Sequence, residues 1–253
     1  MPSPARRALP SPALFPLAAT ATALAALLTL TGCTPDKTRD GRDTDTTASP
    51  ATAGSALRAV AALDVKGRAP KTGYARSRFG SAWADTDGNG CDTRDDILRR
   101  DLRATVFRGG DCVVVSGTLA RDPYTGEAIR YTRGRSKVDI DHVVALSDAW
   151  QKGAGRWPAR KRIALANDPL NLIAVDASAN RRKSDGDAAT WLPAYRPYRC
   201  TYVAHQVAVK KKYGLWVTGA EKDAMVRVLN SCPQERLPGG GSPTQAPARF
   251  SAK

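Results

Sequence analysis

The residues best suited to chemistry lie in the middle of the chain. Asp141 stands directly before His142 within the largely apolar stretch 138–146, and Asn171 and Asn180 follow downstream. A histidine near its ordinary pKa of about 6.5 can accept a proton from water at neutral pH. The oxygens of aspartate and asparagine suit hard divalent cations. Together these residues predict a metal ligand beside a general base.

The same residues lie in a wider pattern. Asp-Ile-Asp-His at 139–142 is followed by Asn-Asp-Pro-Leu-Asn-Leu at 167–172, by Asn-Arg-x-Lys-x-Asp at 180–185 and by Trp-Leu-Pro at 191–193. This pattern resembles that of the secreted HNH (ββα-metal) endonucleases related to the GmrSD C-terminal domain. The resemblance covers residues 76–232.

The resemblance implies an α+β fold with an HNH core over about residues 137–193, preceded by a small antiparallel sheet and flanked by helices. In such a core a strand, a loop, a strand and a helix wrap one divalent cation. His142 would be the general base, and Asp141 and Asn180 would bind Mg²⁺ or Mn²⁺. Neighbouring residues of a strand point to opposite faces, so the strand must end and bend for Asp141 and His142 to reach one cleft.

Four further residues have expected roles around this centre. By the same resemblance, Asn171 holds the loop or orients the general base, and capping of backbone groups is compatible with either role. Arg181 and Lys183 are candidates for phosphate contacts during catalysis, or else form an exposed basic turn. Asp139 is expected to support a metal ligand rather than bind the ion, with a plain surface position as the alternative.

The charge of the chain is consistent with a polyanionic partner. The formal net charge is +15 and the pI is about 10.0. Clustered Lys and Arg attract nucleic acid or an anionic membrane, although a well-solvated surface has the same composition. The expected function is a monomeric, metal-dependent endonuclease acting outside the cytoplasm on DNA, with RNA as the less favoured substrate. The rival is a catalytically silent lipoprotein that binds nucleic acid or the cell envelope.

The N-terminal residues have the pattern of a bacterial lipoprotein signal. Arg6 and Arg7 form a basic region, residues 18–30 are mostly apolar, and Leu-Thr-Gly-Cys at 30–33 matches a lipobox. This pattern predicts export, cleavage before Cys33 and lipid attachment to it. The protein would then face outward on the cell membrane. An ordinary secretory signal, releasing the protein, is the alternative.

Composition divides the chain into four parts. We expect residues 1–32 to be the signal peptide, 33–55 a flexible tether, 56–232 the folded domain and 233–253 a disordered tail. The tether is rich in Thr, Asp, Ala and Ser, and the tail in Pro, Gly and Ser. Neither has enough large apolar residues to bury a core.

Four cysteines remain after Cys33, and four cysteines allow three connectivities. We expect the disulfides Cys91–Cys112 and Cys200–Cys232, because each pair closes a short loop within one half of the chain. Zinc binding is the alternative, but no Cys-x-x-Cys occurs and export favours disulfides.

The stretch 85–96 is a candidate calcium loop. Asp85, Asp87, Asn89 and Asp96 fall at positions 1, 3, 5 and 12 of an EF-hand loop, although aspartate at the last position weakens bidentate binding. One alternative is an Asx turn held by the Cys91 disulfide, with Thr93 capping the following helix. Another is a turn that shapes the cleft without binding metal.

Periodicity and turn residues predict the remaining elements. Expected helices cover residues 56–65, 94–102, 146–153, 157–166 and 200–213, with another near 180 capped by Ser178 and a last one from a capping box at Thr218 and Glu221 to Cys232. Expected strands cover residues 104–108, 111–119, 128–132 and 170–175, together with the strand that carries Asp141.

Overall fold

The computed structural model describes residues 54–252 of the chain. The predicted signal peptide, the predicted lipidation site Cys33 and nearly all of the predicted tether lie outside these residues. Helices and strands follow in the order α1 (Ala56–Ala61), η1 (Arg76–Phe79), α2 (Thr93–Asp101), β1 (Arg103–Arg108), β2 (Val113–Leu119), β3 (Ile129–Thr132), β4 (Val138–His142), α3 (Leu146–Gln151), η2 (Ala154–Arg156), α4 (Ala159–Asn167), η3 (Pro169–Asn171), β5 (Leu172–Asp176), α5 (Ala177–Lys183), η4 (Arg196–Tyr198), α6 (Arg199–Tyr213) and α7 (Gly219–Asn230). None of the helices in this range is long and apolar enough to cross a membrane.

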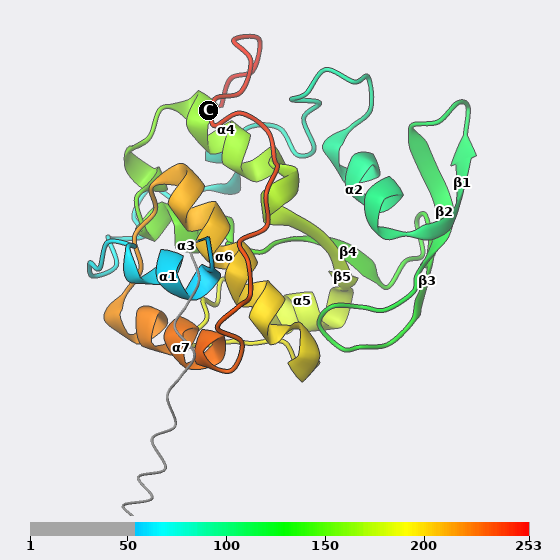
Figure 1. Cartoon of the computed structure of the whole chain (residues 1–253). Coiled ribbons are helices and arrows are strands. Elements are labelled where there is room, and N and C mark those ends of the chain that lie inside the picture. Colours follow the sequence, from blue (N-terminus) through cyan, green and yellow to red (C-terminus); the bar gives the residue numbers. More distant parts are fainter. Residues whose placement is uncertain (1–53, 253) are drawn as a thin grey trace, which may run out of the picture. The chain divides into compact units, whose positions relative to one another are not determined.

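The strands form two antiparallel sheets, and with the helices they make an α+β fold (Figure 1). β1, β2 and β3 form a three-stranded sheet in that order, and β4 pairs with β5. In the β4–β5 pair, Asp141 lies opposite Ile173 and His142 opposite Leu172. The fold class is therefore confirmed, as is the small antiparallel sheet that precedes the strand carrying Asp141.

Apolar side chains form three clusters that fix these elements. One cluster lies between α1, α6 and α7, a second between η1, α3, α4 and α6, and a third between α2 and the strands. Helix α6 takes part in the first two clusters, with Val207 in one and Val209 in the other. The chain between β4 and β5, where helices at 146–153 and 157–166 were expected, forms a helical insertion that consists of α3, η2, α4 and η3.

The N-caps of two helices lie one or two residues before the predicted ones. Helix α5 follows β5 directly, and the Asp176 carboxylate accepts a hydrogen bond from the Ala179 N–H at 2.7 Å. Asp176 is therefore the N-cap instead of Ser178. Asp92 caps α2 in the same way, in place of Thr93. In each case the carboxylate also complements the positive end of the helix dipole, which a hydroxyl does less well.

Helix α7 begins with the predicted capping box. The Glu221 N–H donates to the Thr218 hydroxyl at 3.2 Å, and the Thr218 N–H donates to the Glu221 carboxylate at 3.3 Å. Glu221 is fully buried, so its negative charge requires partners inside the protein.

Buried charged residues around Glu221 join α3, α6, α7 and the chain after α5. Lys152 contacts the carboxylates of Asp148, Asp187 and Glu221 at 2.6, 2.8 and 2.6 Å. Lys210 contacts Asp148 at 3.1 Å and Glu221 at 3.0 Å. All five residues, here called the buried charge cluster, are at most 2% exposed. An unpaired charge at such a position would cost several kcal/mol, so each side chain depends on the others.

Arg68 attaches the N-terminal part of the domain to this cluster. Its guanidinium contacts Asp148 at 2.9 Å and Asp187 at 2.6 Å. The segment that leads from α1 to η1 is thereby held against α3.

Both expected disulfides are present. Cys91–Cys112 joins the turn before α2 to the start of β2, and Cys200–Cys232 joins the first turn of α6 to the residues after α7. Each bridge closes a local loop and so restricts the unfolded chain.

Residues 233–252 differ from the expected disordered tail. Their backbone is bonded to the domain: the Ala56 N–H donates to the Glu235 carbonyl oxygen at 2.8 Å, and the Ser242 N–H donates to the buried Asp168 carboxylate at 3.1 Å. The segment runs alongside the helices (Figure 1). The segment has too few large apolar side chains to form a core of its own, but its backbone groups form hydrogen bonds with the folded domain.

The buried charge cluster predicts a large difference between two neighbouring lysines of α6. Lys210→Met should lower the free energy of unfolding by about 3–5 kcal/mol, because Asp148 and Glu221 lose a buried cation. Lys211 is exposed, so Lys211→Met should change the free energy of unfolding by less than about 0.5 kcal/mol. Urea denaturation of both variants measures this difference. Equal stability of the two would contradict the importance of the cluster.

Candidate active site

His142 is the last residue of β4, and α4 orients its ring. Nε2 lies 2.9 Å from the carbonyl oxygen of Ala166. A carbonyl oxygen can only accept a hydrogen bond, so Nε2 carries the hydrogen and donates it. In the neutral ring the lone pair is then on Nδ1, which is the nitrogen able to accept a proton.

The surroundings keep this ring neutral. Burial, followed by the positive charge of Arg76, lowers the pKa of His142 to about 3. At neutral pH the ring is therefore unprotonated. An anionic group close to Arg76 would oppose the effect of that charge and raise the pKa towards its ordinary range.

Asp141 is buried, and two side chains hold its carboxylate. The Tyr124 hydroxyl donates to Oδ2 at 2.5 Å, and the Lys183 ammonium lies 3.1 Å from Oδ1 and 3.0 Å from Oδ2. Lys183 also donates to the His142 carbonyl oxygen at 2.9 Å. Burial raises the pKa of Asp141, while Lys183 and Tyr124 favour its charged form.

Lys183 is therefore placed differently from the expectation. Its ammonium is buried and bonded to Asp141 and to a backbone carbonyl, so it is neither part of an exposed basic turn nor positioned to contact phosphate. Its contacts instead hold α5 against β4. Arg181 is exposed on the same helix, and its role at a phosphate stays a prediction.

Asn180 and Asp139 contact each other. Asn180 Nδ2 donates to the Asp139 carboxylate at 3.3 Å, which leaves Oδ1 of Asn180 as the free acceptor of this amide. This is the contact expected if Asp139 supports a metal ligand instead of binding the ion.

Asn171 connects the chain on either side of the helical insertion. Its Oδ1 accepts from the Val144 N–H at 2.8 Å, and its Nδ2 donates to the carbonyl oxygens of Val144 and Leu165, each at 3.3 Å. Asn171 is fully buried. It therefore holds the loop that follows His142, which is one of its two expected roles.

A pocket of about 360 Å³ brings the predicted residues together. Its wall includes Asp141 and His142 from β4 and Asn180 from α5. Lys71 and Arg76, from the segment held by Arg68, also line it and add positive charge. The pocket thus offers a neutral base, two oxygen donors and two cations.

The oxygen donors suit a hard divalent cation held with few protein ligands. One carboxylate and one amide line the pocket, and Mg²⁺ commonly completes its shell with water and phosphate oxygens. Within residues 54–252, no group of three or more His, Cys, Asp or Glu side chains is arranged to hold a metal ion. Binding of Mg²⁺ or Mn²⁺ at Asp141 and Asn180 therefore stays a prediction.

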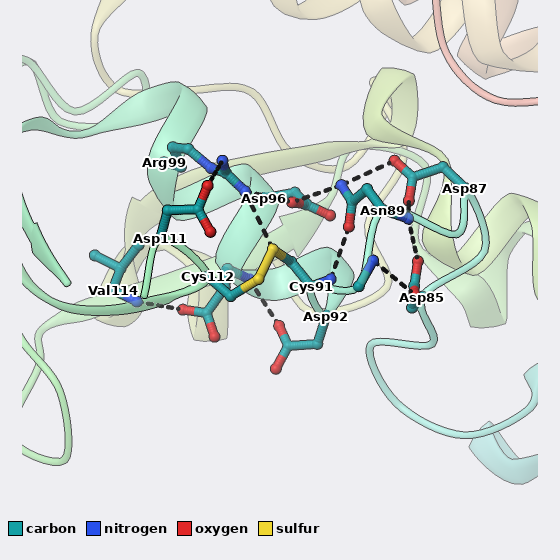
Figure 2. The surroundings of a disulfide bond; sticks show 12 residues. Asp85, Asp87, Asn89, Cys91, Asp92, Asp96, Arg99, Asp111, Cys112 and Val114 are labelled. Atoms are coloured by element: carbon teal, nitrogen blue, oxygen red, sulfur yellow. Dashed lines mark hydrogen bonds and ion pairs between the residues drawn. A yellow bond between two sulfur atoms is a disulfide. The ribbon is translucent and has the colours of Figure 1, made fainter. Parts of the chain in front are cut away.

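The candidate calcium loop is closed by its own hydrogen bonds (Figure 2). The Asp85 carboxylate accepts from three following backbone N–H groups at 2.7, 3.2 and 3.1 Å. The Asn89 amide donates to Asp87 at 3.3 Å and to Asp96 at 3.1 Å. This is the Asx turn that was the alternative to a calcium loop, next to the Cys91–Cys112 disulfide, and calcium binding stays a prediction.

Tyr124 and Arg76 were not predicted as site residues. Tyr124 lies in the Asp-Pro-Tyr-Thr-Gly segment at 122–126, whose composition indicates only a turn. Its contact with Asp141 depends on how the sheet leads into β4, for which the local sequence has no signal.

Comparisons with known proteins identify the family of the chain. Residues 92–228 match the family described as GmrSD restriction endonucleases, C-terminal domain. An "Uncharacterized secreted protein" of Arthroderma benhamiae is 40% identical over 182 residues, which cover 71% of this chain and 86% of that protein. No solved structure gives a significant match.

The Asp85 turn predicts an effect that needs no metal. In the presence of a chelator, Asp85→Ala should lower stability by about 1–2 kcal/mol, because three backbone N–H groups lose their acceptor. Asp111→Ala, at a largely exposed carboxylate beside the same disulfide, serves as the control. Thermal denaturation of both variants, with chelator and with calcium, measures these changes in stability. A calcium-dependent stabilisation that Asp87→Ala removes would show that the turn also binds the ion.

Proposed function

Because the chain belongs to the family of GmrSD restriction endonuclease C-terminal domains, we propose that it is a divalent-metal-dependent endonuclease of the HNH type. Its substrate is nucleic acid, DNA in preference to RNA. The observation that carries the proposal is the His142 ring, whose Nε2 donates to Ala166 and whose Nδ1 remains as a base. This ring shares a pocket wall with Asp141 and Asn180.

The residues support hydrolysis by an activated water. His142 takes a proton from water at Nδ1, and the water oxygen forms a new bond to phosphorus while the bond to the leaving nucleotide oxygen breaks. The leaving oxygen takes a proton from solvent, and the imidazolium later returns its own. The Ala166 carbonyl keeps Nε2–H in place throughout, since it bonds the hydrogen in either protonation state.

Positive charge on the pocket wall favours the anionic substrate. Lys71 and Arg76 line the pocket, and the whole chain carries a formal charge of +15. Asp141 and Asn180 would hold the metal ion, which when bound stabilises the charge that develops on the phosphate and on the leaving oxygen.

Action outside the cytoplasm is the second part of the proposal. The two disulfides suit an oxidising compartment, and the relative from Arthroderma benhamiae is named as secreted. The lipobox at 30–33 adds lipid attachment at Cys33, a residue outside the described part of the chain. The mature protein would then be held at the outer face of the cell membrane.

The proposed base gives the first test. His142→Ala should lower cleavage of plasmid DNA in Mg²⁺ by at least about a hundredfold, because a general base contributes this much or more. The chain has two histidines, so His205→Gln is a matched control and should retain cleavage. Cleavage should also stop when a chelator removes the metal.

Two outcomes would contradict the function. Undiminished cleavage by His142→Ala would remove this residue from the mechanism. Retardation of DNA in gels by the wild-type protein, without cleavage in any divalent metal, would identify the catalytically silent binder instead.

The proposed anchor predicts a change of location. In a bacterial host, Cys33→Ser should move the protein from the membrane fraction to the medium, or leave the precursor uncleaved, because lipid attachment needs the thiol. Fractionation followed by mass spectrometry of the N-terminal residue measures this. Membrane association that persists after the Cys33→Ser variant has been processed would rule out the lipid anchor.

A further inference from the structure

A second pocket, of about 230 Å³, also has His142 in its wall. Its wall is mainly apolar and includes Phe79, Trp83 and Leu146. His142 and Arg76 line both this pocket and the pocket that holds Asp141 and Asn180. A ligand group in the second pocket would therefore lie directly beside the proposed site of hydrolysis.

Trp83 offers this pocket a flat aromatic surface. Its indole lies nearly parallel to the His142 imidazole, with an interplanar angle of 8° and ring centroids 6.1 Å apart. The Trp83 backbone has a φ of 59°, in the left-handed region that a bulky residue rarely adopts. Such backbone costs free energy and is concentrated at functional sites.

Asn167 adds a polar group with no protein partner. It is 1% exposed and lies at the end of α4, in the pocket wall. Its Nδ2 donates to the Ile163 carbonyl oxygen at 3.0 Å, which fixes the amide orientation. Its Oδ1 has no hydrogen-bond partner among the described residues, although a buried polar atom ordinarily has one. The pocket wall therefore includes an aromatic side chain and an amide whose oxygen has no protein partner.

These features match a nucleobase. Every base has a flat face that stacks on an aromatic side chain, and adenine, cytosine and guanine carry an amino group that can donate to an amide oxygen. Arg76, between the two pockets, is a suitable partner for the phosphate that links such a base to its neighbour.

We propose that the pocket lined by Trp83 and Asn167 binds one unstacked base of the substrate next to the scissile phosphate. The base stacks on Trp83 and donates its amino group to Asn167 Oδ1. This inference rests on the proposed function and deepens it: the enzyme prefers single-stranded or locally opened nucleic acid, and an amino-bearing base over thymine at that position.

Binding of mononucleotides tests the pocket without relying on cleavage, because dAMP and dTMP contain no phosphodiester bond. Wild-type protein should bind dAMP more tightly than dTMP. Trp83→Gly should weaken dAMP binding by about tenfold or more, as loss of a stacking partner does. Glycine adopts positive φ readily, which offsets part of the packing against the third apolar cluster that this variant loses, and thermal denaturation checks that the variant is folded. Trp216→Ala, at a partly exposed tryptophan in neither pocket wall, should bind dAMP like the wild type.

Asn167→Leu gives a second, independent readout. It should abolish the preference for dAMP over dTMP. It should also make the frequency of cleavage along a single strand of mixed sequence independent of the base at each position. Unchanged dAMP binding by Trp83→Gly would overturn the proposal. Trp83-dependent binding in a protein that cleaves nothing would support the base pocket and refute the nuclease function. Cleavage that depends on neither Trp83 nor Asn167 would support the nuclease function and refute the base pocket.

Discussion

The arrangement of the domain depends on charges that have been removed from water. Lys152 and Lys210 lie among Asp148, Asp187 and Glu221, from parts of the chain that are far apart in sequence. Apolar packing alone tolerates small shifts of helices. Buried ion pairs, in contrast, lose most of their favourable interaction energy when their geometry changes. The cluster therefore specifies how α3, α6 and α7 meet, whatever its net contribution to stability.

The pocket around His142 owes its shape to this constraint. Asp148 belongs to the helix that follows His142, and through Arg68 it also holds the segment that carries Lys71 and Arg76. A second buried pair, Lys183 with Asp141, holds α5 and thus Asn180 at the same wall. Charge pairing thus positions the pocket walls, and His142 and Asn180 line the pocket without taking part in these ion pairs.

Strand alternation and helix signals located most of the elements, whereas the fold class was predicted from the resemblance to a nuclease family. Asp141, His142 and Asn180, which the same resemblance grouped, do line one pocket. Sequence could not assign Lys183, because an exposed phosphate contact and a buried counter-ion require the same residue type. Trp83 and Tyr124 were likewise seen only as part of a loop and a turn. Trp83 contacts His142, and Tyr124 contacts Asp141. The spacing of residues along the sequence does not predict such contacts between distant segments.

The contacts of residues 233–252 show that the folded domain extends beyond the residues that the family model matches. The family match runs from 92 to 228, yet the folding unit begins before Arg68 and continues past Ser242. The matched core lacks Arg76 and Trp83, and without the last segment Asp168 loses one of its backbone donors. A recombinant fragment cut at the limits of the family match would therefore keep the motif and lose part of its pocket. What the family model matches and what folds as one body are different lengths of chain.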